Sequence, residues 1–267
     1  GRHDVGQAAV ITQGRVEAIE GAEGTDRMIA RVGQRRREAA GDPIIRSRGV
    51  LVKRPKPGQD LRVDLPAIGP DTVQKAADAR LTGIAAMSGH VLAASRFELI
   101  HAAERDGIFV VGLADQAKAS GTHAATKLAD GDPLVFGKID PASAVKADVQ
   151  RGIAIMSMLA QFSIGTALVI RKGRVLAIGT SESSVDVLER AAHYYKPGRK
   201  RVGIAFLGHR TPVDEALIEA IAAQGLEGLV VMFGREDRPQ HRGSIVARAD
   251  ALGLFIAGAP VAAMEPA

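Results

Sequence analysis

Hydrophobic and polar positions along the chain predict one series of strands and helices that occurs twice. Two β-rich runs around a Gly-containing turn, at Ala8–Thr12 and Arg15–Ile19, have a hairpin pattern, and a second hairpin is expected at 167–170 and Arg174–Ile178. After each hairpin, apolar residues with helical spacing alternate with short β-rich runs. Strands that alternate with helices are typical of a sheet with helices packed on it.

The elements after each hairpin have the same order in both halves. In the first half we expect a helix capped by Thr25, then a strand at 49–53, a helix at 70–80, a strand at 83–87, a helix at 96–106 and a strand at 108–112. In the second half we expect a helix after Ser184, then equivalent elements at 202–207, 212–224, 228–233, 242–252 and 254–258. A helix at 142–162 precedes the second hairpin, and residues 1–6 read as the tail of an equivalent helix whose leading part the first copy lacks.

Blocks of similar sequence also favour two copies of one unit. The run Gly6-Gln-Ala-Ala-Val-Ile corresponds to Gly165-Thr-Ala-Leu-Val-Ile at a separation of 159 residues (165 minus 6). We therefore predict an α/β protein with two tandem related domains, each a mixed sheet with packed helices. Residues 1–114 are expected to form the catalytic domain, and 134–260, with the added N-terminal helix, a structural one; the polar stretch 115–133 reads as the linker.

Composition and charge narrow the chemistry. The chain has 267 residues, of which 46% are hydrophobic, so it is long enough for two cores. Cysteine is absent, which excludes disulfides, thiolate catalysis and thiolate metal sites. A net charge of +5 suits an anionic partner such as phosphate, nucleotide or an acidic membrane surface, and a basic protein without such a partner is an equal alternative. Aromatic residues make up only 3%, which argues against nucleic acid as a partner.

The first polar segment of the first copy runs from Glu17 to Asp26 and puts carboxylates on a strand end, a turn and a helix start. Glu23 and Asp26 are candidate Mg²⁺ ligands, because Mg²⁺ prefers oxygen and needs few carboxylates besides substrate phosphate. Backbone N–H groups at a helix start can also bind phosphate, which makes Thr25 a candidate substrate-binding residue. The alternative is that Thr25 and Asp26 only cap the helix.

The second polar segment is a Pro/Gly-rich loop after a strand, where α/β sheets commonly bind ligands. Asp60 and Asp64 are candidate catalytic residues that could bind a metal or orient water, and Asp64 is also a candidate metal ligand. Cations beside acids suit phosphoryl chemistry, and an exposed loop of solvated charges is the alternative. The candidate substrate-binding residues of this loop are Lys53, Lys56, Gln59 and Arg62.

The second copy has lost most of these groups, although Glu182 keeps its place, and its equivalent loop has no acid. We therefore expect any chemistry in the first copy, with the turn at 20–26 and the loop at 53–64 meeting in one cleft. A separation above about 10 Å would exclude a single site, since Mg–O bonds are roughly 2.0–2.1 Å.

Several strings of the first copy, among them Glu20-Gly-Ala-Glu23-Gly-Thr25-Asp26 and Arg62-Val-Asp64-Leu-Pro66, resemble the C-terminal domain of LpxI-type UDP-2,3-diacylglucosamine pyrophosphatases. The resemblance extends over residues 1–112. It implies Mg²⁺-dependent (or Mn²⁺-dependent) hydrolysis of a lipid-linked UDP-sugar to UMP and 2,3-diacylglucosamine 1-phosphate in lipid A biosynthesis. It further implies a cytoplasmic location, peripheral to the inner membrane, and an essential carboxylate at Asp64.

The chain also departs from that family, because the Gly-rich strand and loop that open the family's N-terminal domain do not occur in it. An alternative function is therefore a non-catalytic paralogue that binds nucleotide or phospholipid, or that serves in assembly. Related α/β units often pair through similar surfaces, so we expect a homodimer.

Overall fold

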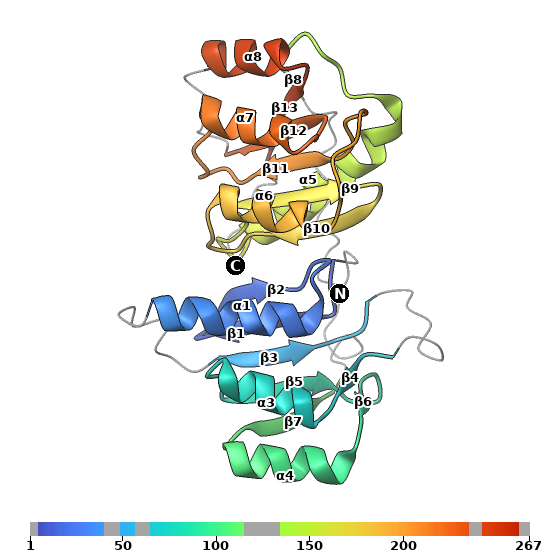
Figure 1. Cartoon of the computed structure of the whole chain (residues 1–267), viewed down its shortest axis with the longest axis vertical. Helices are drawn as coiled ribbons and strands as arrows, with labels where there is room; N and C mark the ends of the chain where they lie inside the picture. The colour runs from blue at the N-terminus through green and yellow to red at the C-terminus, as the bar shows by residue number, and fades with distance from the viewer. Residues whose placement is uncertain (1–4, 40–48, 57–64, 115–133, 235–241, 262–267) are drawn as a thin grey trace. The chain divides into compact units, whose positions relative to one another are not determined.

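The chain forms two compact units, Gly1–His123 (unit one) and Ala124–Ala267 (unit two). The computed structural model describes residues 5–39, 49–56, 65–114, 134–234 and 242–261 (Figure 1). Each unit is a mixed β-sheet with packed helices, which confirms the predicted α/β class. None of the described helices combines the length and the apolar character needed to span a bilayer.

Unit one is built on a five-stranded sheet with the order β2-β1-β3-β5-β7 (Figure 1). β1 is antiparallel to both β2 and β3, whereas β3, β5 and β7 are parallel to one another. A separate pair of short parallel strands, β4 and β6, was not predicted. The bounds are β1 (Ala8–Thr12), β2 (Arg15–Ile19), β3 (Val50–Lys53), β4 (Ala67–Ile68), β5 (Gly83–Met87), β6 (Leu92–Ala93) and β7 (Phe109–Leu113).

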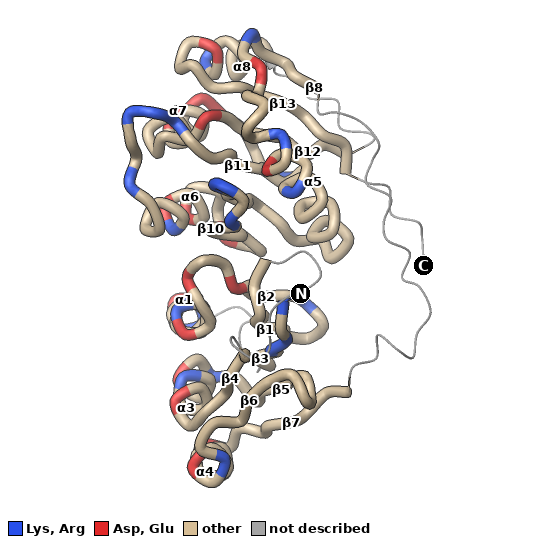
Figure 2. Tube along the Cα trace, turned by 90° about the vertical axis from the view of Figure 1, so that its right-hand side faces the viewer, with Lys and Arg blue, Asp and Glu red and all other residues tan. Residues whose placement is uncertain are grey.

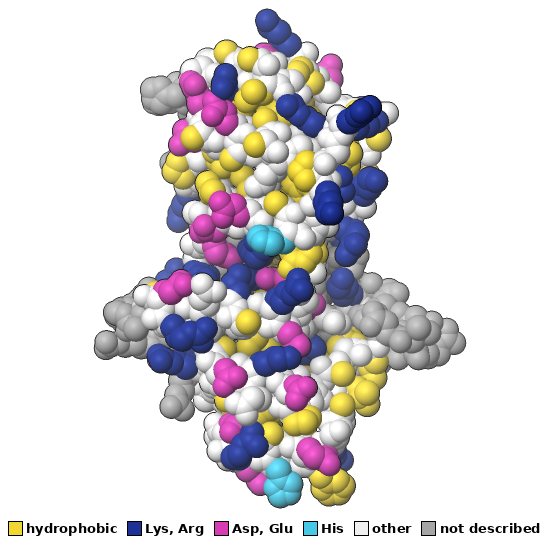
Figure 3. Space-filling view, in the orientation of Figure 1, with side chains coloured by type: hydrophobic (Ala, Val, Ile, Leu, Met, Phe, Trp, Pro, Cys, Tyr) yellow, Lys and Arg dark blue, Asp and Glu magenta, His cyan; other side chains and the backbone are white. Residues whose placement is uncertain are grey.

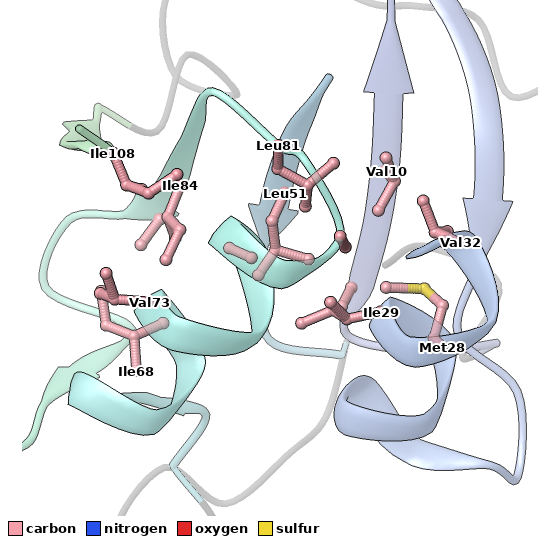
Figure 4. Packing of buried hydrophobic residues seen from close by; sticks show 14 of the residues in the cluster. Val10, Met28, Ile29, Val32, Leu51, Ile68, Val73, Leu81, Ile84 and Ile108 are labelled. Atoms are coloured by element: carbon pink, nitrogen blue, oxygen red, sulfur yellow. The ribbon is translucent and has the colours of Figure 1, made fainter. Parts of the chain in front are cut away.

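Three helices lie side by side on one face of this sheet: α1 (Gly24–Glu38), α3 (Pro70–Asp78) and α4 (Arg96–Asp106) (Figures 1 and 2). Their apolar faces meet the inward side chains of the strands in one core, in which Met28 and Ile29 pack near Val10 (Figure 4). Charged side chains of both signs are spread over the outer surface of these helices in the view of Figure 3, without a patch of one sign.

Unit two repeats the hairpin and the alternating strands and helices of unit one, without the β4–β6 pair among its described residues, and adds three elements. Its sheet has the order β10-β9-β11-β12-β13-β8, so the edge strand β8 (Leu134–Val135) is extra. The 3-10 helix η2 (Ser143–Val145) and helix α5 (Lys146–Ala160) precede the hairpin, and α5 packs on β9, β11 and β12. The remaining elements are β9 (Ala167–Arg171), β10 (Arg174–Ile178), α6 (Ser184–Ala192), β11 (Ile204–Leu207), α7 (Glu215–Ala223), β12 (Gly228–Phe233), α8 (Arg242–Ala251) and β13 (Phe255–Pro260).

The two hairpins share both their turn and an irregularity. Gln13 and Gly14 have φ of 49° and 74°, and Lys172 and Gly173 have 50° and 73°, the left-handed values of a two-residue hairpin turn. The pairing register then skips one residue of the second strand. That residue is Glu17 in unit one and Leu176 in unit two, again 159 positions apart (176 minus 17).

The bulged Glu17 belongs to a buried ion pair that joins α1 to the sheet. Arg36 is only 2% exposed and donates to both Glu17 carboxylate oxygens, at 3.0 and 2.6 Å. It also donates to the Thr12 hydroxyl at 2.8 Å and to the Arg80 carbonyl at 3.0 Å. Because the guanidinium is surrounded by acceptors, its burial is compensated.

Unit two fills the equivalent positions differently. Leu176 replaces the bulged acid, and the Arg171 guanidinium lies over the Tyr195 ring, 4.7 Å from its centroid. Arg171 and Tyr195 stand 159 residues after Thr12 and Arg36. A cation–π contact therefore occurs at the sequence positions of Thr12 and Arg36, although Tyr195 follows the end of α6 whereas Arg36 lies within α1.

The element order was predicted, and the differences are local. Val5 and Gly6 are a bend and coil, so the helix tail predicted for them is wrong there. Asp214 begins α7 by accepting from the Leu217 N–H at 2.8 Å, two residues after the predicted start. Residues 1–4 and the predicted linker 115–133 lie outside the described residues.

Replacing Arg36→Met should destabilise unit one by about 3 kcal/mol, because the buried Glu17 carboxylate loses its guanidinium partner. Urea unfolding of the full chain, with hydrogen exchange followed at α1, measures the effect. The double variant Glu17→Leu/Arg36→Met should recover most of the loss, since no charge then remains. An Arg36→Met protein as stable as the wild type would contradict this role.

Candidate functional site

Strand direction brings the polar segments of unit one to one edge of its sheet. Because β1 is antiparallel to its neighbours, its first residue lies beside the last residues of β2 and β3. The Glu20 N–H donates to the Ala8 carbonyl at 3.0 Å, and the Arg54 N–H donates to the Gln7 carbonyl at 2.8 Å. Gln7, Glu20 and Lys53 are thereby held together.

Glu20 is a buried carboxylate at this edge, with 6% of the residue exposed. Its Oε2 accepts from the Thr25 hydroxyl at 3.0 Å, and the Gln7 backbone also donates to it. Burial raises the pKa of Glu20 above its ordinary 4.5, while the Thr25 hydrogen bond and the positive charges of Lys53 and Lys56 oppose that shift. A side chain at Gly6 would come within 2.2 Å of the Glu20 carbonyl oxygen, so this close approach requires glycine.

Lys53 is the buried cation at the same edge, and it is also 6% exposed. Its Nζ donates to the Ala67 carbonyl at 2.8 Å, a contact that bridges the two ends of the loop between β3 and β4. Burial lowers the pKa of Lys53 below its ordinary 10.5, and the negative charges of Glu20 and Asp26 oppose the shift. The electrostatic interactions with both acids indicate that the turn at 20–26 and the start of the loop converge.

The central part of that loop, residues 57–64, lies outside the described residues. Four candidates from the sequence are in it: Gln59, Asp60, Arg62 and Asp64. Their roles stay predictions, although both ends of the loop that carries them are fixed at the edge by Lys53.

Thr25 has a different role from the helix cap that the sequence predicted. α1 begins at Gly24, and Glu23 stands at its N-cap without a side-chain cap hydrogen bond. The Thr25 hydroxyl instead donates to Glu20. The prediction that Thr25 caps the helix is therefore wrong, and its hydroxyl serves to hold the turn onto the helix.

Glu23 is engaged by an ion pair within the same turn. Arg31 donates to its two carboxylate oxygens at 2.5 and 3.2 Å. Unit two has the same pair with the same eight-residue spacing, Arg190 with Glu182 at 2.8 Å. Because the pair persists where the other charges are lost, it is part of the framework. A metal ion at Glu23, as the sequence predicted, would have to compete with Arg31.

Asp26 is the accessible carboxylate of this edge. Its side chain is 62% exposed and forms an ion pair with Lys75 of α3. An exposed pair of this kind is weak and can exchange for a cation. Within the described residues no three His, Cys, Asp or Glu side chains come together as a metal site. A Mg²⁺ site at this edge would therefore combine Asp26 with carboxylates of the loop at 57–64 and with phosphate oxygens.

Glu20 was not among the candidate site residues predicted from the sequence, although the two copies differ at this position. Glu20 lies 159 residues before Gly179, and a carboxylate that has glycine at its counterpart is not required by the framework. Glu23 differs from Glu20 in this respect, because its counterpart in unit two is also a glutamate, Glu182.

Comparisons with known proteins find one family in both units. A family model described as the LpxI C-terminal domain matches residues 1–111 and 133–257. The UDP-2,3-diacylglucosamine pyrophosphatase LpxI of Caulobacter vibrioides (strain ATCC 19089 / CIP 103742 / CB 15) is 46% identical over 118 residues. The aligned part is 44% of this chain and 42% of that relative, so it spans less than half the length of either.

Replacing Glu20→Gln should stabilise unit one at neutral pH, because burial disfavours the ionised carboxylate. The pKa of Glu20 is higher in the folded than in the unfolded protein, whose value is the ordinary 4.5. The folded state therefore loses stability as the pH rises from 4.5 toward the folded-state pKa. The variant's advantage should therefore be present at pH 8 and vanish below that ordinary value. Thermal unfolding of both proteins across this range checks it; a variant that is less stable at pH 8 would contradict it.

Replacing Glu23→Gln or Glu182→Gln should each destabilise its own unit by about 2 kcal/mol, since each leaves a partly buried arginine without its charged hydrogen-bond partner. Hydrogen exchange at α1 and α6 of the full chain measures the two effects separately. A Glu23→Gln protein of unchanged stability that needs at least about tenfold more Mg²⁺ would instead favour the metal-ligand role, since tenfold corresponds to 1.4 kcal/mol of binding.

Proposed function

The chain belongs to the LpxI C-terminal domain family, and on this premise we propose that it hydrolyses the pyrophosphate bond of UDP-2,3-diacylglucosamine to UMP and 2,3-diacylglucosamine 1-phosphate. The relative from Caulobacter vibrioides is named as the pyrophosphatase of that compound. The observation that carries the proposal is the pair of buried opposite charges, Glu20 and Lys53, at the sheet edge from which the loop with Asp60 and Asp64 departs.

Cations of unit one would favour binding of the substrate diphosphate, Lys56 by direct contact and Lys53, whose ammonium donates to the Ala67 carbonyl, through its positive charge. Lys53 and Lys56 lie at the start of the loop, and the electrostatic effect of both reaches Glu20. Arg62 and Gln59 would add donors from the loop, and Thr25 and the first N–H groups of α1 would face the phosphates. Such donors stabilise charge that develops on phosphate oxygens during transfer.

Carboxylates would hold Mg²⁺, or Mn²⁺, and position water. Asp64 and Asp26 are the proposed metal ligands, with Glu23 as a further ligand if it is released from Arg31. The ion, when bound, supplies charge neutralisation at the phosphates. Asp60 and Asp64 would orient the water, and one of their carboxylates would accept a proton from it. The water oxygen forms a bond to one phosphorus, the bond from that phosphorus to the bridging oxygen breaks, and the released phosphate takes the electron pair.

A lipid-linked substrate would be hydrolysed at a membrane surface. We propose that the protein is cytoplasmic and peripheral to the inner membrane, where its net charge of +5 favours an acidic surface. Unit two would be a structural partner of unit one, and the protein would act as a homodimer.

The alternative is a non-catalytic paralogue that binds nucleotide or phospholipid, or that serves in assembly. One observation favours it for unit two, whose sheet edge carries Gly179 and Leu207 where unit one carries Glu20 and Lys53. This alternative expects ligand binding without turnover.

The purified full chain should release UMP from UDP-2,3-diacylglucosamine in the presence of Mg²⁺, and chelation should stop the release. Asp64→Asn should lower the rate by about 100-fold or more, as expected for a residue that handles the attacking water. The matched control is Asp78→Asn, an exposed acid at the last residue of α3, which should keep the wild-type rate. Ligand binding without UMP release would reject hydrolysis and leave the paralogue, whereas an Asp64→Asn protein of full activity would reject the catalytic role of Asp64.

A further inference from the structure

We propose that Glu20 and Lys53 are positioning residues of the site: together they hold the start of α1 and both ends of the 54–66 loop against the sheet edge, and catalysis depends on that placement. The inference rests on the proposed function for its catalytic consequence. The structural part, that Lys53 restrains the loop, stands on contacts of its own.

Each member of the pair connects an element that carries candidate chemistry to the sheet. Glu20 joins the end of β2 to α1 through the Thr25 hydroxyl and to β1 through the Gln7 backbone. Lys53, the last residue of β3, reaches across the loop to the Ala67 carbonyl in β4. The loop ends and the helix start are therefore fixed to neighbouring strands by two buried charges.

The strand β4 that receives Lys53 is itself paired with β6. The Leu92 N–H donates to the Pro66 carbonyl at 2.7 Å, and the Ala94 N–H donates to the Ile68 carbonyl at 2.8 Å. The Lys53 contact to Ala67 falls between these two bonds. Loss of the ammonium should therefore loosen β4, the strand that follows the segment with Asp64 in the sequence.

Unit two shows that the backbone does not require the acid. Its Gly179 N–H donates to the Ala167 carbonyl at 2.8 Å, as the Glu20 N–H does to Ala8 at 3.0 Å. Gly179 therefore takes the place of Glu20 on the same hydrogen-bonding framework. A side chain there would come within 2.2 Å of the Thr166 hydroxyl, so no carboxylate fits.

Unit two also has no cation at the sheet position of Lys53. Lys53 pairs with Ala8 in the register of unit one, and Leu207 pairs with Ala167 in the register of unit two. Leu207 is fully buried. The same sheet position thus accepts an apolar side chain. The turn after it is held without a charged group: the Gly208 N–H donates to the Thr166 carbonyl and the Thr211 N–H to the Gly208 carbonyl, both at 2.9 Å, and the Thr211 hydroxyl donates to the Thr166 carbonyl at 2.7 Å.

Physical chemistry indicates that the pair does not serve stability. Burial shifts the pKa of both groups toward their neutral forms, and this effect outweighs the attraction between them. Buried opposite charges are often replaceable by apolar residues without loss of stability. Groups that oppose folding and are missing from an equivalent framework are characteristic of functional sites.

The decisive variant gives unit one the residues that unit two already has, Glu20→Gly/Lys53→Leu in the full chain. It should fold, with native circular dichroism and an unfolding midpoint no lower than that of wild type by more than about 5 °C, roughly 1 kcal/mol for a domain of this size. Its kcat should fall by about 100-fold, the loss expected when reacting groups move by about 1 Å. Lys53→Met alone should lower kcat with little change in KM and speed exchange of the Leu92 and Ala94 amides.

The matched control is Glu182→Gln in unit two, which should lower the unfolding midpoint and leave kcat unchanged while the protein is folded. Wild-type kcat in the double variant, or failure of that variant to fold, would overturn the proposal. A rise in KM alone with unchanged exchange would also overturn it, because Lys53 would then be a direct substrate ligand.

Amide exchange separates this inference from the proposed function. If the wild-type chain releases no UMP, faster exchange at Leu92 and Ala94 in Lys53→Met still supports the restraint of the loop. Unchanged exchange in that case rejects it.

Discussion

The antiparallel placement of β1 between β2 and β3 is the constraint on which the candidate site depends. It turns the end of one hairpin strand and the end of the first parallel strand toward the same sheet edge. Glu20 and Lys53 are neighbours for this reason, although 33 positions separate them (53 minus 20).

Unit one contains two kinds of buried charge, and the surroundings distinguish them. Arg36 is saturated by the Glu17 carboxylate, the Thr12 hydroxyl and a backbone carbonyl, so its charge is compensated and it joins α1 to the sheet. Glu20 and Lys53 have fewer partners, and burial shifts the pKa of both toward neutrality. Arg36 with Glu17 stabilises the fold. Burial of Glu20 and Lys53 instead costs desolvation free energy at the sheet edge where the family's chemistry is expected.

Unit two is an internal reference for this distinction, because it has the same strand order and the same hairpin bulge. The turn pair recurs there as Glu182 with Arg190, and therefore belongs to the framework. The edge pair does not recur, since Gly179 and Leu207 occupy its positions. A difference between two copies of one backbone within one chain separates side chains that the fold needs from those that it only tolerates.

The sequence by itself determined the alternation of strands and helices, both hairpins and the two-unit organisation, because these follow from local periodicity and turn residues. It also indicated Lys53 as a candidate site residue, since a cation at a strand end before a Pro/Gly-rich loop is a local signal. Only the tertiary structure decided that Thr25 binds Glu20 instead of capping α1, that Arg31 neutralises Glu23, and that β4 pairs with β6. These outcomes depend on contacts between segments and on the burial of charge, which the order of residues along a chain does not express.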